Sequence, residues 1–157
     1  NLEVSINISF PDIKDKSTLS FISSILEINR DISHFITFEL LESEQIENYD
    51  EVFKFIDLIK SYGCKLAIDD FGSGYSNFTH IFNMNPDILK LDGSLIKDIN
   101  TNKNSENIVK AMIMLAKESG IQTVAEFVDS SEVDEYITKL GIDFGQGYYY
   151  SPPKDIL

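Results

Sequence analysis

The chain has 157 residues, 43% hydrophobic and 25% charged, a balance typical of one globular domain with an apolar core. Its formal net charge is −13, from 26 acidic and 13 basic residues. A nucleic-acid polymer would be repelled by this charge and is excluded as a partner. A small phosphorylated ligand is compatible with this charge if metal ions neutralise part of the acidic charge at its site. The single cysteine, Cys64, rules out an internal disulfide and fits a reducing, cytoplasmic compartment.

Strands and helices alternate along the predicted chain. The apolar runs predict strands over residues 4–9, 35–40, 65–69, 88–92, 123–126 and 144–150. Helices are predicted between them, the first with Ser17 as its N-cap, another ending before Gly63, and a short one over 77–84. The apolar stripes expected to face the core include Leu19, Ile22, Ile25 and Leu26, and later Ile108, Ala111, Met112 and Leu115.

This alternation predicts an α/β fold with a parallel sheet, either open or closed as a barrel. Polar residues stand at or near the carboxyl ends of all six predicted strands, an arrangement that favours a TIM-barrel-like fold. Such a barrel has eight strands and about 250 residues. The chain also begins with Asn1 and enters its first strand at once. We therefore expect residues 1–157 to be an incomplete barrel, cut from a longer protein and lacking two N-terminal strands.

Asp69 and Asp70 follow a buried strand, where α/β folds place their ligands. Two adjacent carboxylates repel each other unless a cation lies between them, and carboxylate oxygens suit a divalent cation. The alternative is that Asp acts here as a turn former or helix cap. Gly72 and Gly74 would let the following loop move or approach a ligand, although they equally suit a tight turn.

Charged residues also interrupt other predicted strands. Lys90 lies on a strand buried on both faces, so its ammonium needs either an ion pair with Asp92 or an anionic ligand. Glu39 and Glu126 are carboxylates in apolar strands, for which a shared metal cage is the economical explanation. Asn7 adds one more oxygen, and Glu42 and Asp129 are either supporting groups or helix caps. The set suits two divalent cations and metal-assisted phosphodiester hydrolysis.

Several motifs resemble those of the EAL domain family. The most diagnostic is Asp69-Asp70-Phe71-Gly72-Ser73-Gly74-Tyr75-Ser76. Further matches, in chain order, are Val4-Ser5-Ile6-Asn7-Ile8-Ser9, Phe38-Glu39-Leu40-Leu41-Glu42-Ser43, Leu89-Lys90-Leu91-Asp92, Val124-Ala125-Glu126 and Gln146-Gly147-Tyr148. The resemblance covers the whole chain. It implies a TIM-barrel-like phosphodiesterase that opens cyclic di-GMP to linear pGpG with Mg²⁺ or Mn²⁺.

The resemblance also implies roles for individual residues. Asn7, Glu39 and Asp69 would bind a first metal, and Asp69, Asp70 and Glu126 a second. Lys90 and Gln146 would hold the attacking water, Glu42 would brace the loop after the aspartates, and Asp129 stands where the family usually has a glutamate. Two features depart from the family pattern: the Glu-Ala-Leu segment is absent, and Phe127 replaces the usual glycine, which would crowd the mouth of the site.

Three interpretations follow. The first is that the parent protein hydrolyses cyclic di-GMP, while the 157-residue chain alone is inactive unless a second copy or a partner domain completes it. The second is a degenerate domain that binds cyclic di-GMP or a partner protein without turnover. The third, a barrel enzyme of enolase type with Lys90 as base, fits the residue types but not the Asp-Asp-Phe-Gly loop.

Overall fold

The computed structural model describes residues 2–42, 46, 48–74 and 78–154. Among the residues used in the sequence predictions, Ser43, Tyr75, Ser76 and Asn77 lie outside this description. The elements are β1 (Val4–Asn7), α1 (Phe10–Lys14), α2 (Lys16–Ile28), a 3-10 turn (Ser33–Phe35), β2 (Ile36–Leu41), α3 (Tyr49–Ser61), β3 (Lys65–Phe71), α4 (Phe78–Asn83), β4 (Ile88–Leu91), α5 (Gly93–Ile96), α6 (Lys103–Glu118), β5 (Gln122–Ala125), α7 (Ser131–Leu140) and β6 (Phe144–Gly145).

The strand order follows the chain, β1-β2-β3-β4-β5-β6, and the pairs β1–β2, β4–β5 and β5–β6 are parallel. This arrangement confirms the α/β class and the TIM-barrel-like alternation, here with six strands. The chain divides into two compact units, one of residues 1–68 and 76–87 and the other of residues 69–75 and 88–157. Within the described residues, none of the helices combines the length and apolar character needed to cross a membrane.

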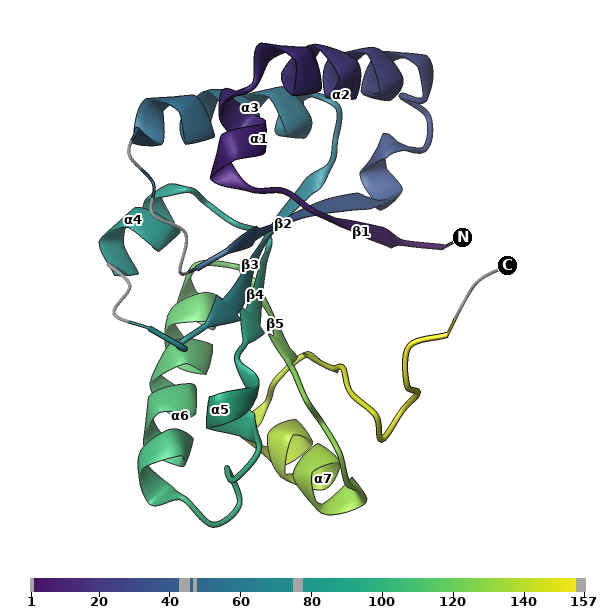
Figure 1. Cartoon of the computed structure of the whole chain (residues 1–157). Coiled ribbons are helices and arrows are strands. Elements are labelled where there is room, and N and C mark those ends of the chain that lie inside the picture. The colour runs from purple at the N-terminus through teal and green to yellow at the C-terminus, as the bar shows by residue number, and fades with distance from the viewer. Residues whose placement is uncertain (1, 43–45, 47, 75–77, 155–157) are drawn as a thin grey trace. The chain divides into compact units, whose positions relative to one another are not determined.

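In the first unit, β1 and β2 pair in register from Val4 opposite Ile36 to Asn7 opposite Glu39. Helices α1, α2 and α3 lie on one side of these two strands (Figure 1). The chain leaves β1 earlier than predicted, because Ser9 and Asp12 form a capping box that starts α1. The predicted N-cap of the next helix was wrong, since Asp15 rather than Ser17 caps α2.

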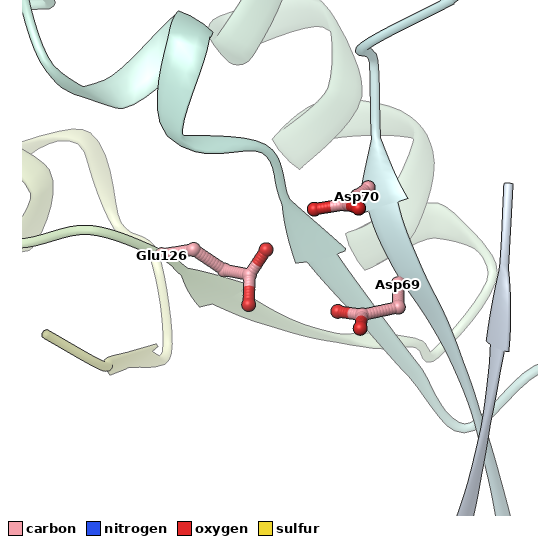
Figure 2. Close-up of side chains that lie close together, drawn as sticks. All are labelled: Asp69, Asp70 and Glu126. Carbon is pink, nitrogen blue, oxygen red and sulfur yellow. The ribbon is translucent and has the colours of Figure 1, made fainter. Parts of the chain in front are cut away.

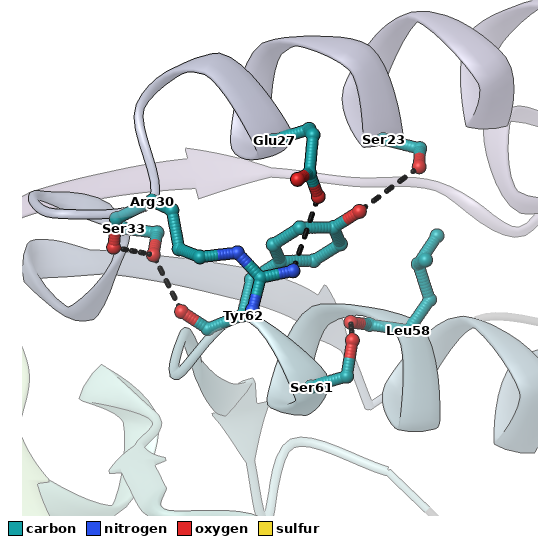
Figure 3. A network of polar contacts seen from close by, with 7 residues as sticks. All are labelled: Ser23, Glu27, Arg30, Ser33, Leu58, Ser61 and Tyr62. Atoms are coloured by element: carbon teal, nitrogen blue, oxygen red, sulfur yellow. Dashed lines mark hydrogen bonds and ion pairs between the residues drawn. The ribbon is translucent and has the colours of Figure 1, made fainter.

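A polar network joins the end of α2 to the end of α3 (Figure 3). The Arg30 guanidinium lies 4.7 Å from the centre of the Tyr62 ring and 3.0 Å from Glu27. Ser33 Oγ donates to the Tyr62 carbonyl oxygen at 2.5 Å, and Ser23 Oγ lies 3.4 Å from the Tyr62 hydroxyl. Gly63 follows with a φ of 82°, so the left-handed turn expected after this helix is confirmed.

In the second unit, β4, β5 and β6 pair in parallel and α5, α6 and α7 connect or follow them. The predicted core face of α6 was largely wrong. Of the four predicted residues only Met112 is buried, whereas Ile108, Ala111 and Leu115 are exposed. The helix buries Val109, Ile113 and Ala116 beside Met112. The stripe on α2 was also only partly correct, because Ile25 is exposed and Leu26 is buried.

Two further strand boundaries also differ from the prediction. β3 continues through Asp70 to Phe71, whereas β6 ends at Gly145 instead of residue 150. Beyond β6 the chain turns on itself, as the Tyr150 N–H donates to the Gly147 carbonyl at 3.1 Å. The short helix α5, which the sequence analysis did not predict, begins because the Asp92 side chain accepts the Ser94 N–H.

Candidate metal centre

Three carboxylates converge in the second unit. Asp69 and Asp70 are consecutive residues near the end of β3, and Glu126 comes directly after β5. One oxygen of each can be chosen so that all lie within 4.8 Å of one another. The three side chains point toward a common space in Figure 2. Such spacing suits carboxylates that share a divalent cation.

Lys90 is the cation built into this cluster. Lys90 lies on β4 and is 6% exposed. Its ammonium lies 2.5 Å from Asp69 Oδ1 and 3.0 Å from Glu126 Oε1. A buried ammonium requires such partners because an unpaired charge in the interior is strongly destabilising. The expectation that Lys90 faces anionic groups rather than solvent is therefore met by two carboxylates of the cluster.

Backbone geometry sets the direction of these side chains. The Asp92 N–H donates to the Phe71 carbonyl at 3.1 Å, and the Glu126 N–H donates to the Leu91 carbonyl at 3.1 Å. These hydrogen bonds connect the carboxyl end of β4 to the carboxyl ends of β3 and β5. Asp70 has a φ of 53°, a left-handed conformation that Asp tolerates better than most residues. The turn at Asp70 allows two adjacent residues to contribute to the same cluster, whereas a regular strand would send them to opposite faces.

The cluster is acidic enough to disturb the protonation of its members. Burial raises the pKa of Glu126 to about 7, although Lys90 partly offsets the effect, and the charges of Asp69 and Asp70 raise it further. The pKa of Asp70 is also raised, mainly by burial and then by the negative charges of Asp69 and Asp92. Because the pKa values of Glu126 and Asp70 are both raised, the protein alone does not fully stabilise three ionised carboxylates.

Two observations favour a divalent cation at this cluster. Glu126 Oε2 is buried and has no hydrogen-bond partner among the described residues, so its acceptor capacity is unused. Three carboxylates and one ammonium carry a formal charge of −2, which one divalent cation would balance. The donors are all hard oxygens, as Mg²⁺ and Mn²⁺ prefer. The residues present therefore fit a divalent metal ion.

A cavity of about 420 Å³ opens beside Glu126. Its other lining residues are Lys97, Phe127, Asp129, Gln146, Gly147 and Tyr148. Phe127 and Tyr148 are both largely exposed aromatic residues, and Lys97 is an exposed cation. The cavity thus combines apolar walls with a few polar groups next to the Glu126 carboxylate of the cluster, as ligand sites commonly do.

The model of the family described as "EAL domain" matches residues 1–153, which is nearly the whole chain. The chain belongs to the EAL domain family. The relationship suggested by the motifs is therefore confirmed.

Named relatives agree with this assignment. The cyclic di-GMP phosphodiesterase PdeA of Borreliella burgdorferi is 36% identical over 152 residues, covering 97% of this chain and 23% of that protein. The crystal structure of the EAL domain of Mycobacterium smegmatis DcpA has a TM-score of 0.88 at 27% identity, covering 98% of this chain and 69% of that one. The Klebsiella pneumoniae BlrP1 manganese/cy-diGMP complex has a TM-score of 0.82 at 28% identity, covering 93% and 38%. The chain thus spans about a quarter of the curated relative.

The remaining predicted ligands of this EAL chain lie in the first unit. Asn7 is the last residue of β1 and pairs in register with Glu39 inside β2, so the two residues stand side by side on neighbouring parallel strands. Glu42 is buried just after β2.

Asp92, in the second unit, caps α5 and accepts the Ser94 N–H at 2.9 Å, while Lys90 pairs with Asp69 and Glu126. The alternative of an ion pair between Lys90 and Asp92 is thus not needed to explain why the Lys90 ammonium is buried.

The loop and cavity residues of the EAL chain have distinct surroundings. Gly72 has a φ of 97°, and a Cβ there would lie 2.5 Å from Leu95 Cδ1, whereas a Cβ at Gly74 would meet nothing within 4 Å. Asp129 and Gln146 are exposed and line the cavity. Sequence reasoning did not select Gly93 or Lys97. The only signal for Gly93 was its place directly after the Lys90 strand, and Lys97 carried none.

Proposed function

We propose that the protein containing this chain hydrolyses cyclic di-GMP to linear pGpG in a reaction that depends on divalent metal. The convergence of Asp69, Asp70 and Glu126 around the buried ammonium of Lys90 carries the proposal. Metal-assisted phosphodiester hydrolysis needs such a set of oxygen ligands beside a cation. The names of two relatives support the substrate: PdeA is a cyclic di-GMP phosphodiesterase, and BlrP1 was crystallised with manganese and cyclic di-GMP.

Mg²⁺ or Mn²⁺ is the proposed metal, in a site for two ions. Asp69, Asp70 and Glu126 would hold one ion, because their oxygens lie within 4.8 Å of one another. The family resemblance predicts that Asn7 and Glu39 join Asp69 around the other ion. When bound, the ions would supply Lewis-acid stabilisation of the phosphoryl oxygens and a lower pKa for the attacking water.

The other proposed residues act on the water and the substrate. The Lys90 ammonium is a hydrogen-bond donor beside Asp69 and Glu126, and we propose that it also orients the attacking water. Gln146 lines the cavity next to Glu126, and its amide can both donate to and accept from water. Holding the water between these two groups would fix its direction of attack. Glu42 is proposed to brace the loop containing Gly72 and Gly74, with Asp92 and Asp129 supporting the site from its edge.

The cellular setting is also proposed. The single cysteine and the intracellular nature of a nucleotide signal favour a cytoplasmic site of action. We further propose that the protein acts as a homodimer or together with partner domains in its own chain. The strongly acidic composition argues against nucleic-acid polymers as partners.

Incubation of the intact protein with cyclic di-GMP, followed by chromatography of the nucleotides, tests the proposal. Linear pGpG should accumulate with Mn²⁺ or Mg²⁺ and should disappear after EDTA treatment. A parallel equilibrium binding assay with the same protein separates the two functional interpretations. Tight binding of cyclic di-GMP with no release of pGpG would instead support a domain that binds the nucleotide without turnover.

A further inference from the structure

The turn that follows Glu126 contains an unusual backbone conformation. Phe127 has a φ of 55°, in the left-handed region that bulky L residues rarely occupy. The residue is also 67% exposed, so little burial of apolar surface compensates for the strain. Such conformations persist only where the surrounding structure determines them, and they are concentrated at functional sites.

Backbone hydrogen bonds hold both sides of this turn. The Glu126 N–H donates to the Leu91 carbonyl at 3.1 Å, and the Val128 N–H donates to the Gln146 carbonyl at 3.0 Å. A Cβ on Gly147 would lie 2.2 Å from the Val128 carbonyl oxygen, so only glycine allows this close approach. The backbone N–H groups of Glu126 and Val128 are therefore both held, and Phe127 forms the turn between them.

The Phe127 ring occupies the space that a side chain at Gly93 would need. A Cβ at Gly93 would lie 2.4 Å from Phe127 Cδ2, 2.7 Å from its Cγ and 2.9 Å from its Cβ. Gly93 is buried and is the first residue of α5. It has no left-handed φ, so alanine would suit its backbone and would be the better helix former. The contact with Phe127 is thus the reason in this structure for glycine at position 93.

We propose that Gly93 and Phe127 form a matched pair that positions Glu126 for metal binding. The ring rests on Gly93 and keeps the turn in its left-handed conformation, and this conformation directs Glu126 toward Asp69 and Lys90. Phe127 is a positioning residue in this scheme and contacts neither the metal nor the reacting atoms. The metal-binding part of the inference rests on the proposed function, whereas the steric pairing of the two residues does not.

The test uses the intact protein with Gly93→Ala, Phe127→Gly and the double variant. Urea unfolding without metal measures the steric pairing. Gly93→Ala should lower the unfolding midpoint when Phe127 is present and should leave it unchanged or raise it when Phe127 is replaced by glycine. Mn²⁺ titration followed by electron paramagnetic resonance measures positioning. Gly93→Ala should weaken Mn²⁺ binding by about tenfold or more, the scale seen when groups that orient metal ligands are lost. The double variant should bind Mn²⁺ as Phe127→Gly does.

Gly141→Ala is the matched control. Gly141 ends α7 with a φ of 86°, so alanine there should lower the unfolding midpoint without changing Mn²⁺ affinity. Two outcomes overturn the proposal: equal effects of Gly93→Ala in both backgrounds, or unchanged Mn²⁺ affinity in Gly93→Ala. Absence of Mn²⁺ binding by the unaltered protein would defeat the proposed function and the positioning of a metal ligand, while the unfolding midpoints would still decide the steric pairing.

Discussion

The ammonium of Lys90 lies 2.5 Å from Asp69 Oδ1, and both side chains are largely buried. This contact joins β4 to β3 at the point where the three carboxylates of the cluster converge. Lys90 also reaches Glu126 at 3.0 Å, so one cation holds two of the three acidic groups in place. The same contacts that stabilise the fold therefore shape the proposed site, and variants of these residues should change both properties.

Asp69→Asn should abolish or nearly abolish hydrolysis of cyclic di-GMP. The substitution keeps the size of the side chain but removes its charge, so the cluster loses both a metal ligand and the partner of Lys90. We expect kcat to fall by about 100-fold or more, the scale found when a preorganised electrostatic group is removed. The exposed Asp98→Asn is the matched control and should retain full turnover. Unchanged turnover in Asp69→Asn would remove this residue from the metal site.

Lys90→Met should destabilise the metal-free protein. Without the ammonium, Asp69 and Glu126 are left as buried, uncompensated carboxylates, a situation that costs about 3–5 kcal/mol in unfolding free energy. A divalent cation replaces part of the missing positive charge, so Mn²⁺ should restore more stability to Lys90→Met than to the unaltered protein. Urea unfolding with and without Mn²⁺ measures both effects. Equal stabilisation of the two proteins by Mn²⁺ would show that Lys90 and the metal do not share the same carboxylates.

The stability of the metal-free protein should decrease as the pH rises from about 4.5 to about 7. The pKa of Glu126 is raised from 4.5 to about 7 by burial, so the folded state retains a proton that the unfolded chain has already released. Stability from this group is complete below the unfolded pKa and is lost as the pH rises through the folded pKa. The loss amounts to about 3 kcal/mol at most.

Glu126→Gln should remove this part of the pH dependence. Urea unfolding of both proteins without metal, across pH 5 to 8, gives the comparison. Metal binding requires the ionised carboxylate, so the Mn²⁺ affinity of the unaltered protein should increase over the same interval. Parallel stability curves for the two proteins would show that Glu126 does not titrate in this range.

The two glycines after Asp70 should respond differently to alanine. At Gly72, a Cβ would lie 2.5 Å from Leu95 Cδ1 and 2.9 Å from Met112 Cε, and the φ of 97° disfavours any side chain. We expect Gly72→Ala to lower the unfolding free energy by about 1–3 kcal/mol. At Gly74, a Cβ would meet nothing within 4 Å, so Gly74→Ala should stay within about 0.5 kcal/mol of the unaltered protein. Equal losses at both positions in urea unfolding would contradict this distinction.

The placement of charged residues near neighbouring strand ends was the most predictable feature, although the exact ends of β1, β3 and β6 differed from the prediction. Apolar runs followed by acidic residues or lysine placed Asp69, Lys90 and Glu126 at neighbouring strand ends, and parallel strands bring such ends together. The buried face of α6 was less predictable. Apolar residues occur on both sides of that helix, and the side that packs, with Val109 and Ile113, depends on its partner elements rather than on spacing alone.

The sequence by itself determined the α/β class, the family and the identity of the acidic groups and the lysine, because these follow from residue types and their order along the chain. Only the tertiary structure decided which groups meet. It paired Lys90 with Asp69 and Glu126, assigned Asp92 to the cap of α5, and seated the Phe127 ring on Gly93. The ion pairs of Lys90 and the contact of Phe127 with Gly93 join residues far apart in the chain, and local spacing does not specify them.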